Sequence, residues 1–142
     1  GISPLEVQEL KNRFPGLKIM QAIPVLSGVP LEEQKIMQYI KEYEPVSDFF
    51  LIDTKAPMAG DIGATGLTHD REIDRVIVES TKVPCIIAGG LDADNVAEAI
   101  HVTHPYGVDS FSLTNYDDER ADTLHCKDPA KVKAFIEASQ NA

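Results

Sequence analysis

Short apolar runs recur along the chain, separated by longer segments in which polar and apolar residues mix. Each run is rich in β-branched, aromatic or other large apolar residues, a composition typical of buried strands. None approaches the roughly 20 apolar residues that a membrane-spanning helix needs. The runs cover Lys18 to Ile23, Phe49 to Ile52, Cys85 to Ala88, and Gly107 to Phe111. We therefore predict at least four strands in a soluble protein.

The segments between the runs have helical spacing. It is clearest from Asn95 to Val102, where Val96, Ala99 and Ile100 lie at positions i, i+3 and i+4. The order of elements is therefore a helix followed by four strand–helix units. Because parallel neighbours need crossover connections, this alternation predicts a parallel sheet covered by helices. The pattern alone leaves open whether the sheet is doubly wound or part of a (βα)8 barrel.

Two further helices carry start signals. Ser3-Pro4-Leu5-Glu6 is a capping box with proline at the first helical position. Asp128 and Pro129 mark the start of the last helix in a similar way. The expected apolar stripes are Val7, Leu10 and Phe14 in the first helix and Val132, Phe135 and Ile136 in the last.

Length and charge narrow the class of protein. With 142 residues and no compositional break, the chain is expected to form one domain. It has 13 Lys and Arg against 23 Asp and Glu, a net charge of −10 that repels nucleic acid and anionic lipid. The N-terminus has neither the basic start nor the apolar run of a signal peptide, which predicts a cytoplasmic protein. Cys85 and Cys126 are expected to be reduced thiols.

Residues that follow the strands are the candidates for chemistry, because parallel α/β folds bind ligands at the carboxyl ends of their strands. Asp53 ends the second run, where an apolar setting can raise the pKa of a carboxyl and suit it to general acid catalysis. The alternative is that Asp53 caps a loop or pairs with Lys55.

Two glycine-containing segments also follow strands. Gly63, Ala64, Thr65 and Gly66 lie in a loop of small residues that suits close approach to a substrate, or is simply a surface loop. It is no P-loop, because Leu67-Thr68 replaces the required Lys-Ser/Thr.

Gly89 and Gly90 lead directly into the next helix, where backbone amides favour a phosphate. Asp92 and Asp94 lie nearby and can occupy those amides or repel an anion. The alternative for the glycine pair is a tight strand-to-helix turn without a ligand.

The remaining histidines and cysteines are weaker candidates. His101 and His104 have no third ligand at metal-binding spacing, so we expect no metal and assign them to the surface or a helix end. Cys85 begins its strand and is placed far from the ligand end. His69, His125 and Cys126 fall in loops on the ligand side.

Taken in order, the loop sequences resemble the phosphoribosylanthranilate isomerase family of tryptophan biosynthesis. The resemblance extends from Ser3 to Ala138 and is carried by the following segments: Leu51-Ile52-Asp53-Thr54-Lys55, Gly63-Ala64-Thr65-Gly66-Leu67-Thr68-His69-Asp70, Ile87-Ala88-Gly89-Gly90-Leu91, Asn95-Val96-Ala97-Glu98-Ala99-Ile100, Pro105-Tyr106-Gly107-Val108-Asp109 and Lys127-Asp128-Pro129.

The resemblance implies a TIM (βα)8 barrel and an Amadori rearrangement of a phosphoribosyl amine, without metal or organic cofactor. It makes Asp53 the general acid and Gly63, Ala64, Thr65 and Gly66 the substrate loop. It places the substrate phosphate on Gly89, Gly90 and the loop after the last strand, at Ser112 and Leu113.

The resemblance also implies that residues 1–142 form one partial barrel domain, comprising the family's fourth helix and βα units five to eight. Strands one to four, and the general-base cysteine at the end of strand one, have no counterpart. We expect the fragment to be inactive alone, and either to self-associate or to need a missing N-terminal half. The alternative is a non-catalytic relative that binds a phosphorylated metabolite or only assembles with a partner.

The sequence departs from the family pattern in two loops. Leu113 stands where a glycine is expected, and a leucine resists positive φ and crowds a phosphate. Ala64 replaces one glycine of the usual pair, and Leu67 and His69 stand where lysine and an aromatic residue are common. These departures predict a substrate that differs from the family's, or a lost activity.

Overall fold

The computed structural model describes residues 2–26, 29–55, 67–120 and 125–142. Helices and strands alternate along these residues, so the predicted order of elements is confirmed. The elements are α1 (Pro4–Arg13), β1 (Met20–Leu26), α2 (Ile36–Tyr43), β2 (Phe49–Lys55), α3 (Leu67–Ser80), β3 (Cys85–Ala88), α4 (Val96–Thr103), β4 (Gly107–Val108) and α6 (Pro129–Gln140), with short 3-10 turns η1 (Leu31–Glu33), η2 (Glu44–Val46) and η3 (Ser112–Thr114).

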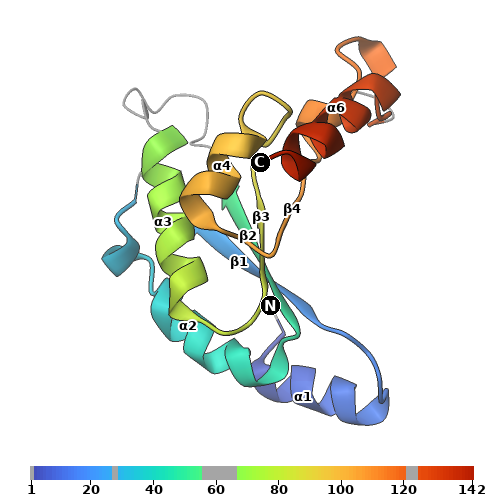
Figure 1. Cartoon of the computed structure of the whole chain (residues 1–142). Coiled ribbons are helices and arrows are strands. Elements are labelled where there is room, and N and C mark those ends of the chain that lie inside the picture. Colours follow the sequence, from blue (N-terminus) through green and yellow to red (C-terminus); the bar gives the residue numbers. More distant parts are fainter. Residues whose placement is uncertain (1, 27–28, 56–66, 121–124) are drawn as a thin grey trace.

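The strands form one parallel sheet in the order β1-β2-β3-β4. Each strand therefore lies beside the next one along the chain, with a helix in each crossover (Figure 1). The register places Pro24 of β1 beside Asp53 of β2, and Asp53 beside Ala88 of β3. This confirms a parallel α/β fold, and it brings the carboxyl ends of the first three strands to one edge of the sheet.

The hydrophobic core lies between the sheet and its helices. Alternate strand residues point to this side, because side chains on a strand alternate between the two faces. Ile23, Phe50, Ile52 and Ile87 are completely buried there. The helices contribute further buried apolar residues, namely Ile36, Ile40, Ile77, Val96 and Ala99. Each large side chain buried in this layer contributes about 1.5 to 3 kcal/mol to folding.

The opposite face of the sheet is apolar and open. Met20 and Leu26 of β1 are 52% and 51% exposed on this face. Their neighbours in β2 and β3, among them Leu51 and Ile86, are half-buried. In the part of the chain that the structure describes, no helix packs on this face (Figure 1). Parallel sheets are normally covered on both faces, so this one is suited to a further layer.

Several predicted details are corrected by the structure. The first strand begins at Met20, two residues later than expected, because the Asp48 carboxylate accepts a hydrogen bond from the Ile19 amide. The last strand ends at Val108, before Phe111, because the chain turns toward η3.

Two residues of the expected apolar stripes are exposed. Phe14 is 52% exposed because it is the C-cap of α1 and departs from helical geometry. Ile136 is 46% exposed, whereas its neighbour Phe135 is the buried residue of α6. The stripe of α6 is therefore narrower than predicted.

The predicted helix starts are confirmed. The Ser3 hydroxyl accepts a bond from the Glu6 amide at 3.4 Å, and the Glu6 carboxylate accepts one from the Ser3 amide at 2.7 Å. At the start of α6 the Asp128 carboxylate accepts a bond from the Ala130 amide at 2.9 Å. Such caps satisfy amides that have no partner inside the helix, and each contributes about 1 kcal/mol.

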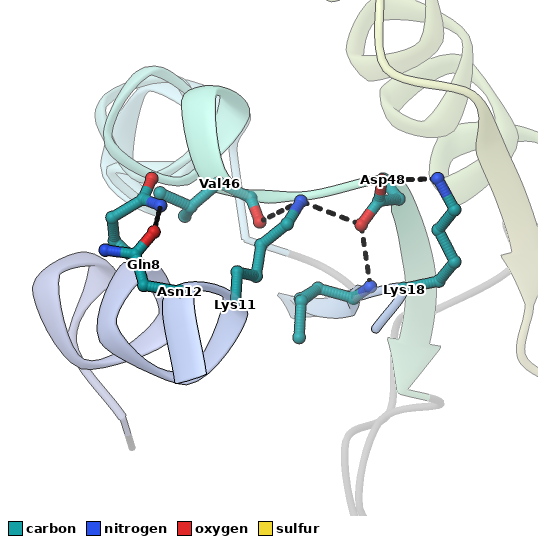
Figure 2. A network of polar contacts seen from close by, with 7 residues as sticks. Gln8, Lys11, Asn12, Lys18, Val46 and Asp48 are labelled. Carbon is teal, nitrogen blue, oxygen red and sulfur yellow. Dashed lines mark hydrogen bonds and ion pairs between the residues drawn. The ribbon is translucent and has the colours of Figure 1, made fainter. Parts of the chain in front are cut away.

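Asp48 joins α1 to the beginnings of β1 and β2. Its carboxylate accepts hydrogen bonds from Lys11 Nζ at 2.9 Å, from the Ile19 amide at 2.8 Å and from Lys18 Nζ at 3.4 Å (Figure 2). Lys11 also donates to the carbonyl of Val46. These bonds favour the ionised carboxylate and lower the pKa of Asp48 to about 2. The network fixes the end of the sheet opposite to the carboxyl ends of the strands.

Replacing Asp48 by Asn is expected to destabilise the protein at neutral pH by about 1 to 2 kcal/mol, allowing for partial exposure. The folded pKa lies below the unfolded one, so the stabilisation is present above about pH 4 and is lost as the pH falls toward 2. Urea denaturation of both proteins between pH 7 and pH 2 measures it. The difference between them should shrink with acid, and a difference independent of pH would contradict the assignment. Asp117→Asn, at an exposed ion pair with Lys131, is the control and should change stability little.

Candidate functional site

Asp53 lies at the carboxyl end of β2, on the open face of the sheet. Its side chain alternates with Ile52, which is buried beneath the helices, so it points to the opposite side. It is half-buried. No described residue forms a hydrogen bond or ion pair with this carboxylate, and the side chain of Lys55 lies outside what the structure describes. The position suits a carboxyl that meets a ligand.

The glycine pair follows β3 at the same edge of the sheet. Gly89 comes directly after Ala88, the register partner of Asp53. Gly89 has φ +91° and Gly90 φ +64°, values that L side chains rarely adopt. A Cβ built on Gly90 would meet nothing within 4 Å, so the conformation of the backbone and not the available space calls for glycine here. The acid candidate and the predicted phosphate turn thus occupy adjacent strand ends.

Three side chains hold consecutive carbonyls of this turn. The carbonyl of Gly89 accepts a bond from Arg71 of α3 at 3.0 Å. The carbonyl of Gly90 accepts one from the Asn95 amide side chain at 2.8 Å, and that of Leu91 one from the Ser110 hydroxyl at 2.6 Å. Arg71 and Ser110 are 18 and 19 residues away from their partners, so tertiary contacts fix the turn together with the local bond from Asn95.

Asp92 occupies two amides in the turn that precedes α4. Its carboxylate accepts bonds from the amides of Asp94 at 2.9 Å and Asn95 at 3.1 Å. The predicted role of Asp92 is thus seen at these two amides, which precede the first residue of α4, and Asp94 is exposed. Among the described residues, no acceptor bonds the amides of Gly90 or Leu91. Those two amides are therefore donors that an anion could bind.

The loop after β4 is shaped by a lysine. Ser112 and Leu113 lie in η3, where Leu113 is 42% exposed. Lys127 donates to the carbonyl of Phe111 and, at 3.2 Å, to the hydroxyl of Thr114. Lys127 therefore brings a positive charge to this loop, next to the residues predicted to contact a phosphate. The structure shows no contact of Ser112 or Leu113 that assigns them a binding role.

The other candidates fall away from the site or outside the described residues. Gly63, Ala64, Thr65 and Gly66, predicted as the substrate loop, lie outside the residues that the structure describes, and so does the His69 side chain. His104 is the C-cap of α4 with φ 48°, as expected for a helix end. Across residues 2–26, 29–55, 67–120 and 125–142, no group of His, Cys, Asp or Glu is arranged to hold a metal ion.

Cys85 lies at the end of the sheet opposite to the site. It is the first residue of β3 and is buried, and burial raises the pKa of its thiol to about 11. A thiol with so high a pKa is protonated at neutral pH and is a poor base or nucleophile. Its placement far from the ligand end is confirmed, so Cys85 cannot supply a base beside Asp53.

Comparison with known proteins decides the family. The family model of N-(5'phosphoribosyl)anthranilate (PRA) isomerase matches residues 6–138. The chain belongs to the phosphoribosylanthranilate isomerase family. Among curated members, N-(5'-phosphoribosyl)anthranilate isomerase 2 of Methanosarcina mazei is 36% identical over 132 residues, which are 93% of this chain and 53% of that protein.

Solved structures of phosphoribosylanthranilate isomerases are similar to the chain as well. The enzyme from Pyrococcus furiosus is 30% identical with a TM-score of 0.70, and the match covers 99% of this chain and 58% of that one. The enzyme from Thermococcus kodakaraensis is 26% identical with a TM-score of 0.73, covering 99% and 60%. The chain thus spans about half the length of the isomerases it matches. No helix in the described ranges is long and apolar enough to cross a membrane.

Sequence reasoning missed Arg71, Asn95 and Ser110 as residues that hold the glycine turn. For Arg71 a signal was present: it shares a helix face with Asp74 and Ile77, at spacings of three residues, on a side that is buried. Charged residues on a buried stripe are rare unless they are paired. No comparable pattern marks Asn95 or Ser110, because their partners lie five and 19 residues away.

The two thiols should react at different rates in the folded protein. Iodoacetamide at pH 8 is expected to alkylate Cys126, which is partly exposed, well before Cys85, which is buried and has a raised pKa. Peptide mapping by mass spectrometry at timed intervals measures both. In urea the two rates should converge. Rapid alkylation of Cys85 in the folded protein would contradict its placement.

Proposed function

We propose that the chain forms part of a phosphoribosylanthranilate isomerase, with Asp53 as the general acid and the Gly89–Gly90 turn as the phosphate site. The register of β2 and β3 carries the proposal, because it places Asp53 beside Ala88 and so beside the turn that follows. A proton donor and an anion site on neighbouring strand ends fit a phosphorylated sugar that reacts at its other end.

The chemistry assigns one role to each group. Asp53 protonates the ring oxygen of the aminated ribose while the bond between that oxygen and the anomeric carbon breaks; the nitrogen lone pair forms the new C=N bond, which leaves a protonated imine and the Asp53 carboxylate. A base then removes the proton from the adjacent carbon, and tautomerisation of the resulting enol gives the aminoketose. The phosphate, bound by the amides of Gly90 and Leu91, keeps the sugar in place throughout. Neither step calls for a metal or organic cofactor.

The base has to come from outside the described sheet. Cys85 is excluded by its position and its raised pKa. The family resemblance places the base on a first strand that has no counterpart in these residues. We therefore propose that the four strands are the C-terminal half of a (βα)8 barrel and that another four-stranded unit covers the open face. Met20, Leu26, Leu51 and Ile86 would then line the barrel interior.

The acidic character of the chain fits the other parts of the proposal. A net charge of −10 is unfavourable for nucleic acid, and a phosphorylated small molecule is the partner proposed here. A biosynthetic isomerase of this kind acts in the cytoplasm, which is where we propose that the chain resides.

A second candidate function rests on Leu113. This partly exposed leucine lies in η3, in the loop predicted to contact the phosphate, where the family pattern has glycine. A bulky side chain there hinders the approach of a phosphate to the backbone. The alternative is a non-catalytic relative that binds a smaller or differently placed phosphorylated metabolite.

The test of the catalytic proposal is complementation of a tryptophan auxotroph by the full gene that encodes this chain. Asp53→Asn should reduce isomerase activity by a factor of about 10² to 10⁴, because the amide cannot donate a proton to the ring oxygen as an acid does. Asp94→Asn, an exposed carboxylate near the same edge of the sheet, is the control and should rescue growth. Equal rescue by both variants would remove Asp53 from the mechanism. No rescue by the unsubstituted gene would favour the non-catalytic alternative.

Self-association of the isolated chain tests the proposed barrel half. Light scattering after size exclusion should give a mass above 15.6 kDa, because the apolar face then packs on that of a second copy. The paired substitutions Met20→Glu and Leu26→Glu should abolish the larger species, since they place charges on that face. Leu5→Glu changes an exposed leucine of α1 and should not. A monodisperse monomer that unfolds cooperatively would contradict this arrangement.

A further inference from the structure

We propose that Arg71 is a positioning residue that fixes the direction in which the Gly89–Gly90 turn presents its amides to a phosphate. The proposal rests on the proposed function, in which this turn binds the substrate phosphate. Arg71 lies in helix α3. It takes no part in the proposed proton transfers and acts on the substrate only through the turn.

Arg71 is buried and reaches two partners at once. The residue is 7% exposed, one guanidinium nitrogen lies 3.0 Å from the carboxylate of Asp74, and the other lies 3.0 Å from the carbonyl oxygen of Gly89. Asp74 is completely buried. Because a buried charge is costly unless paired and hydrogen-bonded, this geometry holds the guanidinium in one place. Arg71 thus links α3 to the turn that follows β3.

The planarity of the peptide bond converts this contact into a direction for the amide. In a trans peptide the carbonyl of Gly89 and the N–H of Gly90 lie in one plane and point in opposite directions. Arg71 draws the carbonyl toward α3, on the helix side of the sheet. The Gly90 amide must then point away from α3, toward the side of the sheet on which Asp53 lies.

Arg71 contributes by orienting the backbone of the turn, and not by attracting the anion with its charge. The carboxylate of Asp74 at 3.0 Å compensates the positive charge of the guanidinium, so little attraction remains for an anion farther away. Glycine is also the residue for which an external restraint matters most, since Gly89 and Gly90 have no side chain to limit their backbone. Without the bond from Arg71, the peptide between them is free to rotate and lose its amide direction.

The fork of arginine is what allows both contacts. Its planar guanidinium presents several N–H donors at fixed angles, whereas the ammonium of lysine is a single point charge on a flexible stem. Arg71→Lys therefore keeps the charge and the ion pair with Asp74 but gives up the bridge to Gly89. This substitution separates the positioning role from the part that Arg71 plays in folding.

The experiment compares phosphate binding by the whole chain and three variants. Inorganic phosphate is titrated at pH 7.5, against sodium chloride at the same ionic strength, and the shifts of the Gly90 and Leu91 amide signals are followed by NMR. Arg71→Lys should weaken phosphate binding at least fivefold and shift the Gly90 signal even without phosphate, while the melting temperature changes by only a few degrees. A purely structural role would lower the melting temperature and leave the affinity of the folded protein unchanged.

A control and a second variant complete the test. Arg75→Lys alters an arginine of the same helix that forms exposed ion pairs with Glu72 and Glu79, and it should leave phosphate binding unchanged. If Arg71→Lys does not fold, Arg71→Met combined with Asp74→Leu removes both charges together, which buried pairs often tolerate, and should show the same loss of affinity.

The outcomes separate this inference from the proposed function. Unchanged affinity in Arg71→Lys, or in the double variant where that is used, overturns the role of Arg71 while the phosphate turn stands. If the unsubstituted chain itself shows no phosphate-dependent shift at Gly90 or Leu91, the phosphate turn is wrong, and the positioning role falls with it.

Discussion

The parallel register between β2 and β3 is the constraint on which the candidate site depends. It sets Asp53 beside Ala88. Gly89, the first residue after β3, therefore lies next to the strand position that carries the Asp53 carboxylate. A slip of one residue would turn Asp53 toward the helices, because strand side chains alternate between faces. The complete burial of Phe50, Ile52 and Ile87 on the helix side makes such a slip costly. The packed core on the helix side thus determines which side chains the sheet presents on its open face.

Much of the fold follows from short-range patterns in the sequence. The helix N-caps and the apolar runs marked most elements, because burial and unsatisfied amides act locally. The end of β4 and the exposure of Phe14 and Ile136 depended on where each element ends and which side of it packs, which periodicity alone does not encode. The positions of Asp53, Gly89 and Gly90 could be predicted as strand ends. The helical spacing of Arg71 and Asp74 signals a buried charged pair, but not that Arg71 holds the turn, because Gly89 lies 18 residues away outside α3.

In the described residues, helices cover the sheet on one side only, so its two faces have different environments. On the helix side, buried residues from strands and helices fill the layer, so local folding of these units has its own driving force. On the other side, Met20 and Leu26 leave apolar surface in contact with water. Parallel sheets lose stability in that state, since hydrophobic strands normally pack on both faces. The covering unit proposed above would supply both the base and the burial of this face.

The chain is acidic, yet its proposed ligand is an anion. Its carboxylates repel that ligand strongly only when they lie close to the site. Interactions among exposed charges are largely screened beyond about 8 to 10 Å at physiological ionic strength, so carboxylates farther than this from the site contribute little there. Among the carboxylates near the turn, Asp92 is engaged by bonds from the amides of Asp94 and Asn95, and Asp53 is the proposed acid on the neighbouring strand end. Direct amide contacts at Gly90 and Leu91 act at hydrogen-bond range, where direction decides their strength. A phosphate site in such a protein must therefore depend on a rigid backbone more than on a positive surface.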